Sequence, residues 1–425
     1  MKYLSFIWII SNIITFNMVK PINKIEVLTA NSETIKSLYY NQVLTSTDVS
    51  NYTGRSIPYI VKVLNELKKS GFVSEDGFAS SKGGRKPLNY SLVSDFYYLL
   101  SIAMDQFSAQ MVIVDMNNNF IGEAVQYEFD INDLTPENLV SYIDEFLGSS
   151  NISRDKIIGL GLTMPGFVDT EQGINYTYMK IADQSLVDFI QQRISIPVFL
   201  ENDSTAIALG EQKFGVAANI KNVMVLNLGW GIGLGMILND KIFRGNNGLA
   251  GEFSHISLFK NGKPCKCGKH GCLETEASLI AVTAIAKEGI KKGQATSLSG
   301  YAEIDADIII NEAIKGDMFS VKLISEAAYH VGEGLAILIH LMNPGAIVLS
   351  GKGSLVGKLW LAPIQQAINE HCIPMLTNFT EFKISDLSNK IQLIGGAALV
   401  VENFGQPLKD KLTAIGSAKI LNKAS

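Results

Sequence analysis

The most informative stretch of this 425-residue chain reads GEFSH at residues 251–255 and, after nine intervening residues, CKCGKHGCLE at residues 265–274. Three thiolates and one imidazole form a closed tetrahedral donor set, which is the structural preference of Zn²⁺. His255, Cys265, Cys267 and Cys272 are therefore predicted to bind one zinc ion. A closed coordination shell leaves no position for a reactive water, so the predicted role of the ion is structural.

Two alternatives remain open at this segment. His270 is a second candidate for the nitrogen ligand, but His255 is preferred because a ligand from a separate segment would fasten that segment to the cysteine loop. The other alternative is a group of reduced core cysteines without a metal. Four cysteines are too few for a disulfide scaffold in a chain of this length, and three of them are clustered. This usage favours a metal site in a reducing compartment, so a cytoplasmic location is expected.

Composition places the chain among globular proteins. Apolar residues make up 47% of it and charged residues 18%, which is typical of a chain that buries a core. No apolar run reaches the roughly 18 residues needed to cross a bilayer, so a multi-span membrane protein is excluded and no membrane partner is expected. The length predicts about three domains or lobes. The formal charge of −5 argues, as an average, against binding a polyanion.

The first 30 residues are read as a poorly defined extension. Residues 3–16 are mostly apolar and follow Lys2, as in the apolar region of a signal peptide, but no small-x-small cleavage site follows them. The alternative is a start codon placed too early, with Met18 beginning the chain. The second interpretation is favoured because the downstream sequence has cytosolic character.

Residues 31–93 predict a small winged helix-turn-helix domain. Short apolar stripes at helical spacing occur at 31–41 and 57–67, and the residues between them contain the capping-box pattern Thr45 to Asp48. Gly54 separates the second helix from the third. Two short strands, at 72–74 and 88–90, flank a polar loop that ends in Gly-Gly-Arg-Lys-Pro. Three helices followed by a hairpin is the order of this DNA-binding motif.

Charge separates this module from the rest of the chain. Eight cations oppose five anions between residues 31 and 93, a net +3, whereas residues 94–425 carry −10. The predicted base-reading residues lie early in the third helix: Ser56, Ile57, Tyr59 and Lys62. Arg85 and Lys86, at the tip of the hairpin, are predicted to contact phosphate or the minor groove. A solvated basic face on a protein-interaction module is the alternative.

The remainder of the chain alternates strands and helices. Apolar strands are predicted within 97–114, with Asp105 and Gln106 in a turn, and at 157–164, 197–200, 223–228 and 347–349. Helices are predicted at 137–147, 204–214 and 325–340. This alternation indicates an α/β fold with mixed sheets.

Several motifs, in this order along the chain, resemble those of the ROK family, which comprises repressors, open reading frames and sugar kinases. They are MPGFV at 164–168, END at 201–203, the glycine-rich run at 229–235, GLAGEFSH at 248–255 with the cysteine loop that ends at Glu274, and NPG at 343–345. The resemblance implies an actin-like ATPase (ribonuclease H-like) fold of two α/β lobes. Lobe boundaries are expected at 94–222 and 223–405, with a tail at 406–425.

The resemblance also implies a sugar between the lobes. The family's sugar-binding positions correspond here to Asn202, Asp203, Glu252, His255 and Glu274. Carboxylates and amides bind vicinal hydroxyls in fixed directions, as a polyol requires. Ser254 stands where the family usually has glycine, a departure that adds only a hydroxyl.

The sequence also bears on whether the protein is a kinase. If this chain were a family kinase, Asp203 would act as the general base. In family kinases the first phosphate-binding turn resembles Asp-x-Gly-Gly-Thr. This chain has Asp105-Gln106-Phe107-Ser108 at that position. Trp230 likewise replaces a small hydroxyl residue in the second turn. Without glycine, a backbone cannot approach phosphate closely.

We therefore expect no enzyme activity, but a sugar-responsive transcriptional regulator, a repressor of carbohydrate metabolism genes. Its expected partners are operator DNA and a small sugar or sugar phosphate, and it is expected to form a homodimer or homotetramer. The alternatives are an ATP-dependent, glucokinase-like sugar kinase with an appended domain, and a sugar-binding scaffold that does not bind DNA.

Overall fold

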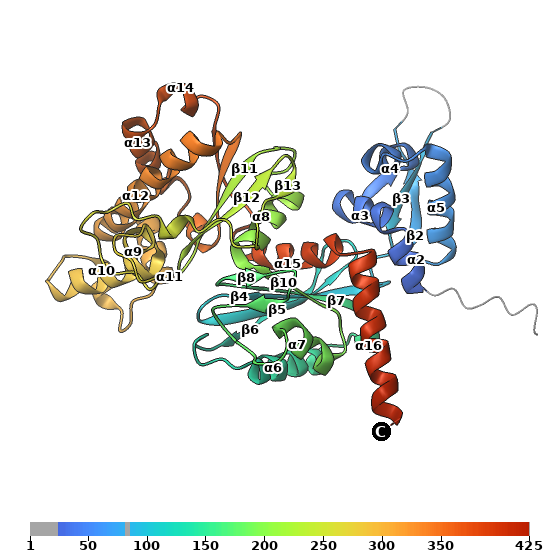
Figure 1. Cartoon of the computed structure of the whole chain (residues 1–425). Coiled ribbons are helices and arrows are strands. Elements are labelled where there is room, and N and C mark those ends of the chain that lie inside the picture. Colours follow the sequence, from blue (N-terminus) through green and yellow to red (C-terminus); the bar gives the residue numbers. More distant parts are fainter. Residues whose placement is uncertain (1–23, 81–85, 425) are drawn as a thin grey trace, which may run out of the picture. The chain divides into compact units, whose positions relative to one another are not determined.

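The computed structural model describes residues 24–80 and 86–424, and it divides into two compact units (Figure 1). The first contains the chain up to Phe96 together with Asn403–Ala414, and the second contains Tyr97–Glu402 and the residues from Ile415 onward. The apolar stretch at 3–16 and the hairpin-tip residue Arg85 lie outside the described residues. The predictions made for them therefore stay predictions.

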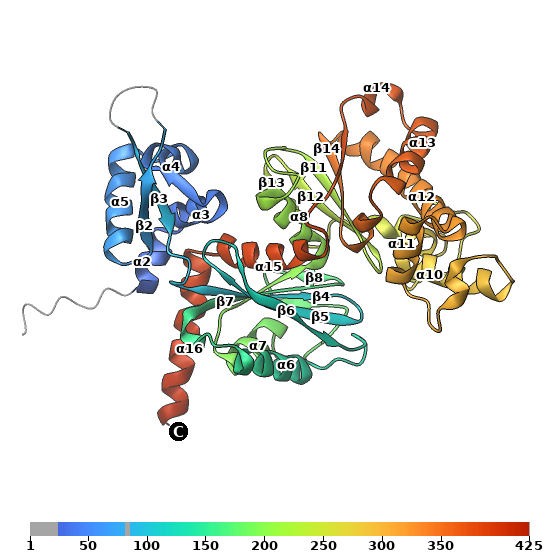
Figure 2. The same ribbon diagram turned by 180° about the vertical axis from the view of Figure 1, so that it is seen from behind.

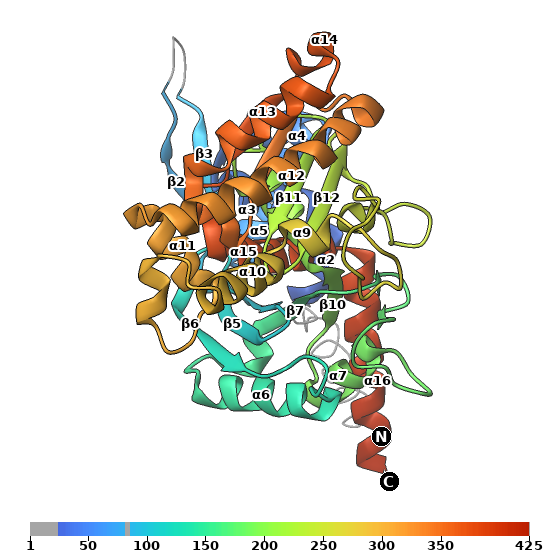
Figure 3. The same ribbon diagram turned by 90° about the vertical axis from the view of Figure 1, so that its left-hand side faces the viewer.

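Residues 24–96 of the first unit form, where they are described, four helices and a three-stranded antiparallel sheet of order β1-β3-β2. Strands β2 and β3 run side by side as a hairpin (Figure 3). The elements are α2 (Lys24–Ala30), α3 (Ser32–Asn41), β1 (Val43–Thr45), α4 (Ser46–Thr53), α5 (Ile57–Lys69), β2 (Val73–Phe78) and β3 (Leu88–Leu92). The predicted order of three helices and a hairpin, within residues 31–93, is present. Helix α2 and strand β1 were not predicted.

Local sequence determines where these helices begin and end. Thr45 and Asp48 form the predicted capping box at the start of α4, and Gly54 ends that helix with φ 66°. Ser56 precedes α5 but makes no side-chain capping hydrogen bond. The predicted apolar stripe of α5 is buried, with Ile60 and Leu64 fully inaccessible. Helix α5 therefore packs its apolar face into the unit and leaves its polar face exposed.

The second unit is built on two five-stranded sheets with the same kind of strand order. The first sheet has the order β10-β7-β4-β5-β6 and the second β13-β12-β11-β14-β15. In each, the first three strands in the sequence pair antiparallel and the last two add in parallel. The strands are β4 (Tyr98–Met104), β5 (Ser108–Asp115), β6 (Phe120–Glu128), β7 (Ile157–Met164), β10 (Val198–Asn202), β11 (Val223–Leu228), β12 (Ile232–Leu238), β13 (Lys241–Ile242), β14 (Ala346–Ser350) and β15 (Glu381–Ile384).

Two central helices join the sheets. Helix α8 (Asp203–Phe214) packs on β11 and β12, α15 (Ile391–Glu402) packs on β4 and β7, and the two helices pack against each other (Figures 1 and 2). Gly395 lies so close to the backbone of Ala206 that a Cβ atom would collide with its carbonyl oxygen. The glycines at this crossing therefore permit close packing of the two helices.

The remaining helices cover the outer faces. Helices α6 (Pro136–Ser149) and α7 (Leu186–Ile194) lie on the opposite side of the first sheet from α15 (Figure 1). Helices inserted between the strands of the second sheet form a helical region in which α12 packs along α13 (Figure 3). That region comprises α9 (Glu274–Ala277), α10 (Leu279–Lys291), α11 (Ala306–Lys315), α12 (Met318–Met342), α13 (Leu361–His371) and α14 (Pro374–Thr377). The described chain ends with α16 (Gln406–Ala424).

The α/β fold predicted from the sequence is confirmed, and we call the two sheets with their helices the first and second lobes. Each lobe buries its own apolar core, one around Leu100 and Ile143 and the other around Leu226 and Leu335. Among the described residues, no helix combines the length and the apolar character needed to cross a membrane.

Candidate functional site

A cavity of about 1440 Å³ lies between the two lobes and is lined by side chains from both. All five predicted sugar-binding residues line it: Asn202, Asp203, Glu252, His255 and Glu274. They come from three separate places in the chain. Asn202 ends β10 and Asp203 begins α8. Glu252 and His255 lie just before and within a short 3-10 helix at 253–255, and Glu274 begins α9. The fold thus brings the predicted residues together on one cavity.

Asn202 and Asp203 are fixed by the start of α8. The Oδ1 atom of Asn202 accepts hydrogen bonds from the Ser204 and Thr205 amides at 2.9 and 3.1 Å, so Asn202 caps the helix. Its Nδ2 atom donates to the Gly166 carbonyl at 3.2 Å. Asp203 accepts from the Ser204 amide at 2.7 Å and from Asn227 Nδ2 at 3.3 Å. These contacts fix the direction in which the Asp203 carboxylate faces the cavity.

Two carboxylates of the cavity, those of Asp203 and Glu252, have raised pKa values. Burial, with Asp105 and Glu274 nearby, raises the pKa of Asp203 to about 6. The pKa of Glu252 is raised to about 7 by desolvation and by the charges of Asp203 and Glu274. The side chain of Glu252 is 44% exposed, and it lines the same cavity as the other carboxylates. Such a cluster both donates and accepts hydrogen bonds near neutral pH, which suits a neutral polyol.

Four residues in and around the cavity were not predicted as site residues. Tyr178 lines the wall, and its pKa is raised by burial and by Asp203 and Glu274. Asn227 supports Asp203 as described, while buried Glu201 pairs with Arg244. Two of these residues left a signal in the sequence: Glu201 directly precedes Asn202, and Arg244 is a lone arginine in a Gly/Asn-rich segment. Neither signal identifies a site residue unless the fold is known.

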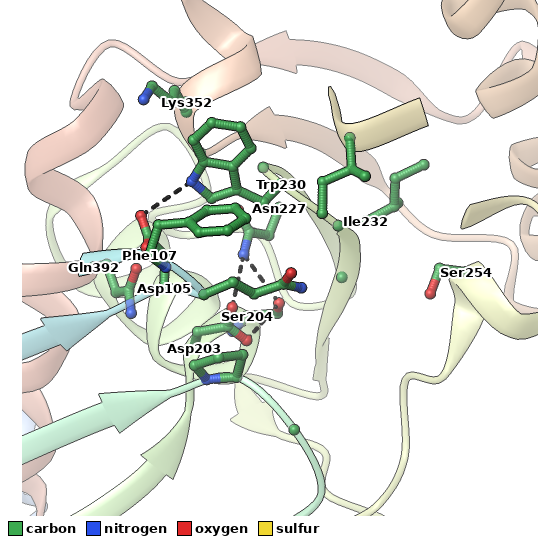
Figure 4. A pocket seen from close by; sticks show the side chains of 18 of the residues that line it. Asp105, Phe107, Asp203, Ser204, Asn227, Trp230, Ile232, Ser254, Lys352 and Gln392 are labelled. Carbon is green, nitrogen blue, oxygen red and sulfur yellow. Dashed lines mark hydrogen bonds between the residues drawn. The ribbon is translucent and has the colours of Figure 1, made fainter. Parts of the chain in front are cut away.

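Ser254, which the resemblance marked as a departure from the family pattern, is buried at the cavity wall (Figure 4). Its small side chain lies within the short 3-10 helix at 253–255, between Glu252 and His255. The added hydroxyl therefore leaves both neighbouring side chains on the cavity.

The predicted metal ligands also converge. The ligand atoms of His255, Cys265, Cys267 and Cys272 all lie within 4.8 Å of one another. Nδ1 of His255 is 3.5 Å from the Cys265 sulfur, and the sulfurs of Cys267 and Cys272 are 3.6 Å apart. Ligands of a tetrahedral zinc ion are separated by about 3.3–3.9 Å, so this donor set fits such an ion. The cluster can therefore bind a metal.

The imidazole of His255 connects this cluster to the cavity. While its Nδ1 atom faces Cys265, its Nε2 atom lies 3.9 Å from the Glu252 carboxylate, on the cavity side. A metal at Nδ1 would fix the ring and its tautomer, leaving Nε2–H as a donor of fixed direction. His270 does not belong to the group of four, and its backbone pairs with Pro264 instead.

Bulky side chains occupy the two turns at which a family kinase would bind phosphate. The β4–β5 turn carries Phe107 and the β11–β12 turn carries Trp230. Their rings meet edge to face with centroids 4.8 Å apart (Figure 4). The Trp230 indole donates to Asp105 Oδ2 at 3.2 Å, and Lys352 Nζ lies 5.1 Å from the centroid of the indole. Asp105 also accepts from the amides of Phe107 and Ser108, both at 2.7 Å.

The glycine-rich run at 229–235 serves packing. Gly233 and Gly235 lie within β12, where a Cβ atom would collide with Ser204 and Ala208 of α8. These two glycines let α8 lie against the sheet. The run therefore gives no independent evidence of nucleotide binding.

The predicted DNA-reading residues occupy the exposed side of α5. Ser56 and Lys62 are exposed, and the apolar side chains of Ile57 and Tyr59 are 45% and 49% accessible. Lys86 is also exposed, next to strand β3. Exposed apolar side chains beside cations suit contact with a polar partner that also offers apolar groups, such as the thymine methyl.

The fold and the cavity define a two-lobed, actin-like protein. The chain belongs to the ROK family. The ROK family model matches residues 108–403. The chain is 28% identical over 397 residues to a xylose repressor of Caldicellulosiruptor bescii, covering 91% of this chain and 97% of the relative. It is 34% identical over 274 residues to a glucokinase of Halalkalibacterium halodurans, covering 63% of this chain and 83% of the relative.

Solved structures agree on the fold. A ROK family transcriptional regulator, homologous to the Mlc protein of Escherichia coli, superposes with a TM-score of 0.73 at 24% identity, covering 92% of this chain and 100% of its own. A ROK family glucokinase from Streptomyces griseus, in complex with glucose and AMPPNP, superposes with a TM-score of 0.63 at 28% identity. The superposition covers 71% of this chain and 98% of the glucokinase chain.

Proposed function

We propose that this protein is a sugar-responsive, DNA-binding repressor of carbohydrate metabolism genes. The observation that carries the proposal is the extent of the match to the xylose repressor. Its 397 aligned residues exceed the segment Tyr97–Glu402, so the similarity extends beyond the two lobes. A sugar cavity with its polar residues in place, and phosphate turns occupied by aromatic rings, support a binding protein rather than a phosphotransferase.

The first unit is proposed to be a winged helix-turn-helix domain. In this proposal α5 enters the major groove with Ser56, Ile57, Tyr59 and Lys62 toward the bases. Lys86 and Arg85 contact phosphate or the minor groove from the β2–β3 hairpin. The boundaries proposed from the sequence are 31–93 for this domain, 94–222 and 223–405 for the lobes, with flanking segments at 1–30 and 406–425.

The ligand is proposed to be a small sugar or sugar phosphate held by Asn202, Asp203, Glu252, His255 and Glu274. D-Xylose and D-glucose are the first candidates because relatives are named for them. The ion is proposed to be structural Zn²⁺ on His255, Cys265, Cys267 and Cys272. It would supply a fixed anchor for the His255 ring, and the protein's own side chains would contact the sugar.

Regulation is proposed to work through lobe closure. Two copies of the chain would present two DNA-binding units, as a homodimer or homotetramer in the cytoplasm, to the two half-sites of an operator. A sugar that binds one closure state more tightly than the other shifts the population of that state. The shift in closure would change the affinity for DNA and, by reciprocity, DNA would change the affinity for the sugar.

A second candidate function is sugar phosphorylation, favoured by the 34% identity to a glucokinase and by Asp203 in the position of a general base. Against it stand Phe107 and Trp230 at the phosphate turns. A coupled assay with MgATP and D-glucose or D-xylose distinguishes the candidates. We expect no turnover above background, and turnover at ordinary kinase rates of about 1–100 s⁻¹ would establish the second candidate instead.

The proposed function is tested by selecting duplexes from a random-sequence library with the purified full chain. We expect one motif with two half-sites to be enriched, and its complex with the protein to dissociate on addition of one sugar from a panel of D-xylose, D-glucose and N-acetyl-D-glucosamine. Enrichment of no motif contradicts DNA recognition. A selected complex that ignores every sugar and sugar phosphate contradicts sugar control.

A further inference from the structure

Glu201 is a buried carboxylate next to the ligand-binding pair Asn202 and Asp203. Glu201 is only 2% exposed. One carboxylate oxygen, Oε1, accepts hydrogen bonds from the Asn202 amide at 3.1 Å and from the Thr170 hydroxyl at 3.2 Å. The other, Oε2, accepts from Arg244 through Nε at 2.8 Å and Nη2 at 2.6 Å. A single carboxylate thus connects three segments that are distant in sequence.

Arg244 belongs to the other lobe and begins the segment that ends at Glu252. We call residues 244–252 the ligand loop. The carbonyl of Arg244 accepts from the Ala250 amide at 3.1 Å, which closes the loop, and the preceding residue Phe243 donates its amide to the Met236 carbonyl of β12 at 2.8 Å. The arginine therefore holds the base of the loop while its guanidinium reaches the first lobe.

Two glycines bring the ligand loop close to neighbouring backbone. Gly248, with φ +78°, lies where a Cβ atom would approach the Val168 carbonyl of the first lobe to 2.9 Å. Gly251, with φ +100°, packs against the Leu234 carbonyl of the second lobe. Side chains could not replace either glycine without moving the loop. The loop is thus closely packed at Gly248 and Gly251, and the ion pair lies at its other end.

We propose that the Glu201–Arg244 ion pair is the tether that positions the ligand loop, and with it Glu252, against Asn202 and Asp203. Arg244 is then a positioning residue for sugar binding. The inference rests on the proposed function, because it assigns the residue that aligns the two sides of that site. The guanidinium is suited to this role since its planar donors fix direction as well as charge.

The pair's role in folding can be separated from its role in binding. Removing Arg244 leaves Glu201 buried without its counter-charge, which destabilises the fold. Neutralising both residues removes that penalty, and a glutamine in place of Glu201 still accepts from Asn202 and Thr170. The double variant therefore regains stability without regaining the charged, two-donor contact that aligns the loop.

The experiment compares Arg244→Gln, Glu201→Gln and the double variant Glu201→Gln/Arg244→Gln in the full chain. Lys213→Gln is the matched control, because it breaks the Lys213–Glu402 ion pair of the same unit, between α8 and α15. Three quantities are measured: the Tm without ligand, the Kd for D-xylose and D-glucose by calorimetry, and hydrogen–deuterium exchange of peptides covering 245–252. We expect Arg244→Gln to lower the Tm and to weaken sugar affinity at least tenfold.

The double variant decides the outcome. We expect its Tm to return toward the wild-type value while its sugar affinity stays low and its ligand loop exchanges faster than in the wild type. Full recovery of both affinity and loop protection, or an equal loss of affinity in Lys213→Gln, overturns the tether. If the wild-type chain binds no sugar, the proposed function fails, while the exchange of 245–252 still tests the tether.

Discussion

The indole Nε1 of Trp230, in the second lobe, donates a hydrogen bond to Oδ2 of Asp105, in the first lobe, at 3.2 Å. This contact joins the β4–β5 turn to the β11–β12 turn. Phe107 packs against the same indole and adds a ring contact across the lobes. The β4–β5 and β11–β12 turns, which the family resemblance matches to phosphate-binding turns, thus contact each other across the lobes.

Replacing Trp230 by phenylalanine should lower stability modestly. The variant keeps an aromatic ring against Phe107 but loses the donor to Asp105. A hydrogen bond to a charged group contributes about 1.5–3 kcal/mol, and its partly exposed position places this one at about 1 kcal/mol. Urea unfolding of the full chain measures the change in the free energy of unfolding. A variant as stable as the wild type would show that the contact adds nothing to folding.

Replacing Asp203 by asparagine should reduce the pH dependence of stability. The pKa of Asp203 is raised to about 6 in the folded protein, against an ordinary value near 4 in the unfolded chain. The folded state therefore binds the proton more tightly, and stability falls as the pH rises from about 4 to about 6 and stays low above that. Asparagine has no proton to lose, so this fall should shrink by about 1–2 kcal/mol.

The pH experiment compares urea unfolding of the wild type and of Asp203→Asn at several values between about pH 4.5 and pH 8. A smaller fall in stability between pH 6 and pH 7 should remain in the variant, because desolvation still raises the pKa of Glu252 after the charge of Asp203 is removed. Parallel curves for the two proteins would mean that Asp203 ionises as easily in the folded state as in the unfolded chain.

Metal content distinguishes the two candidate histidine ligands, His255 and His270. We expect His255→Ala to lose its metal and His270→Ala to keep it, since the ligand atom of His255 is grouped with the three sulfurs. Elemental analysis after purification without chelator measures the zinc per chain. Cys372→Ser is the control, because Cys372 lies outside the cluster. Wild-type protein without zinc would contradict the assignment of the ion.

Lys86 should contribute to DNA affinity without contributing to sequence choice. We expect Lys86→Ala to weaken binding to the selected duplex and to an unrelated duplex by similar factors. It should also reduce the slope of log K against log salt by about 0.9, the loss of one phosphate contact. Tyr59→Ala should instead weaken the selected duplex more. An unchanged salt slope in Lys86→Ala would remove this residue from the interface.

The sequence predicted the parts of the structure that local rules govern. Capping at Thr45, the buried stripe of α5 and the apolar strands at 157–164 and 223–228 follow from spacing and residue type alone. The convergence of the four metal ligands was predicted because three thiols within eight residues, near a histidine, are typical of a metal site. The five cavity residues required the family resemblance, since isolated acids and amides carry no signal of their own.

The contacts that cross the lobes could not be predicted from the sequence. Glu201 and Arg244 are 43 residues apart, and nothing in either segment specifies the other. The position of Gly233 and Gly235 in a strand was not predicted, because the helix that requires their small size lies elsewhere in the chain. Strand β6 was missed because most of its residues are exposed and show no apolar alternation.

The common strand order of the two sheets has a consequence for the Asp105–Trp230 contact. The β4–β5 and β11–β12 turns occupy equivalent positions, because each joins the first two strands of a sheet with the same strand order. The same structural position, used once in each lobe, therefore supplies both sides of the contact. Replacing the ring of one turn leaves the ring of the other in place, so opening this junction requires changes in both lobes.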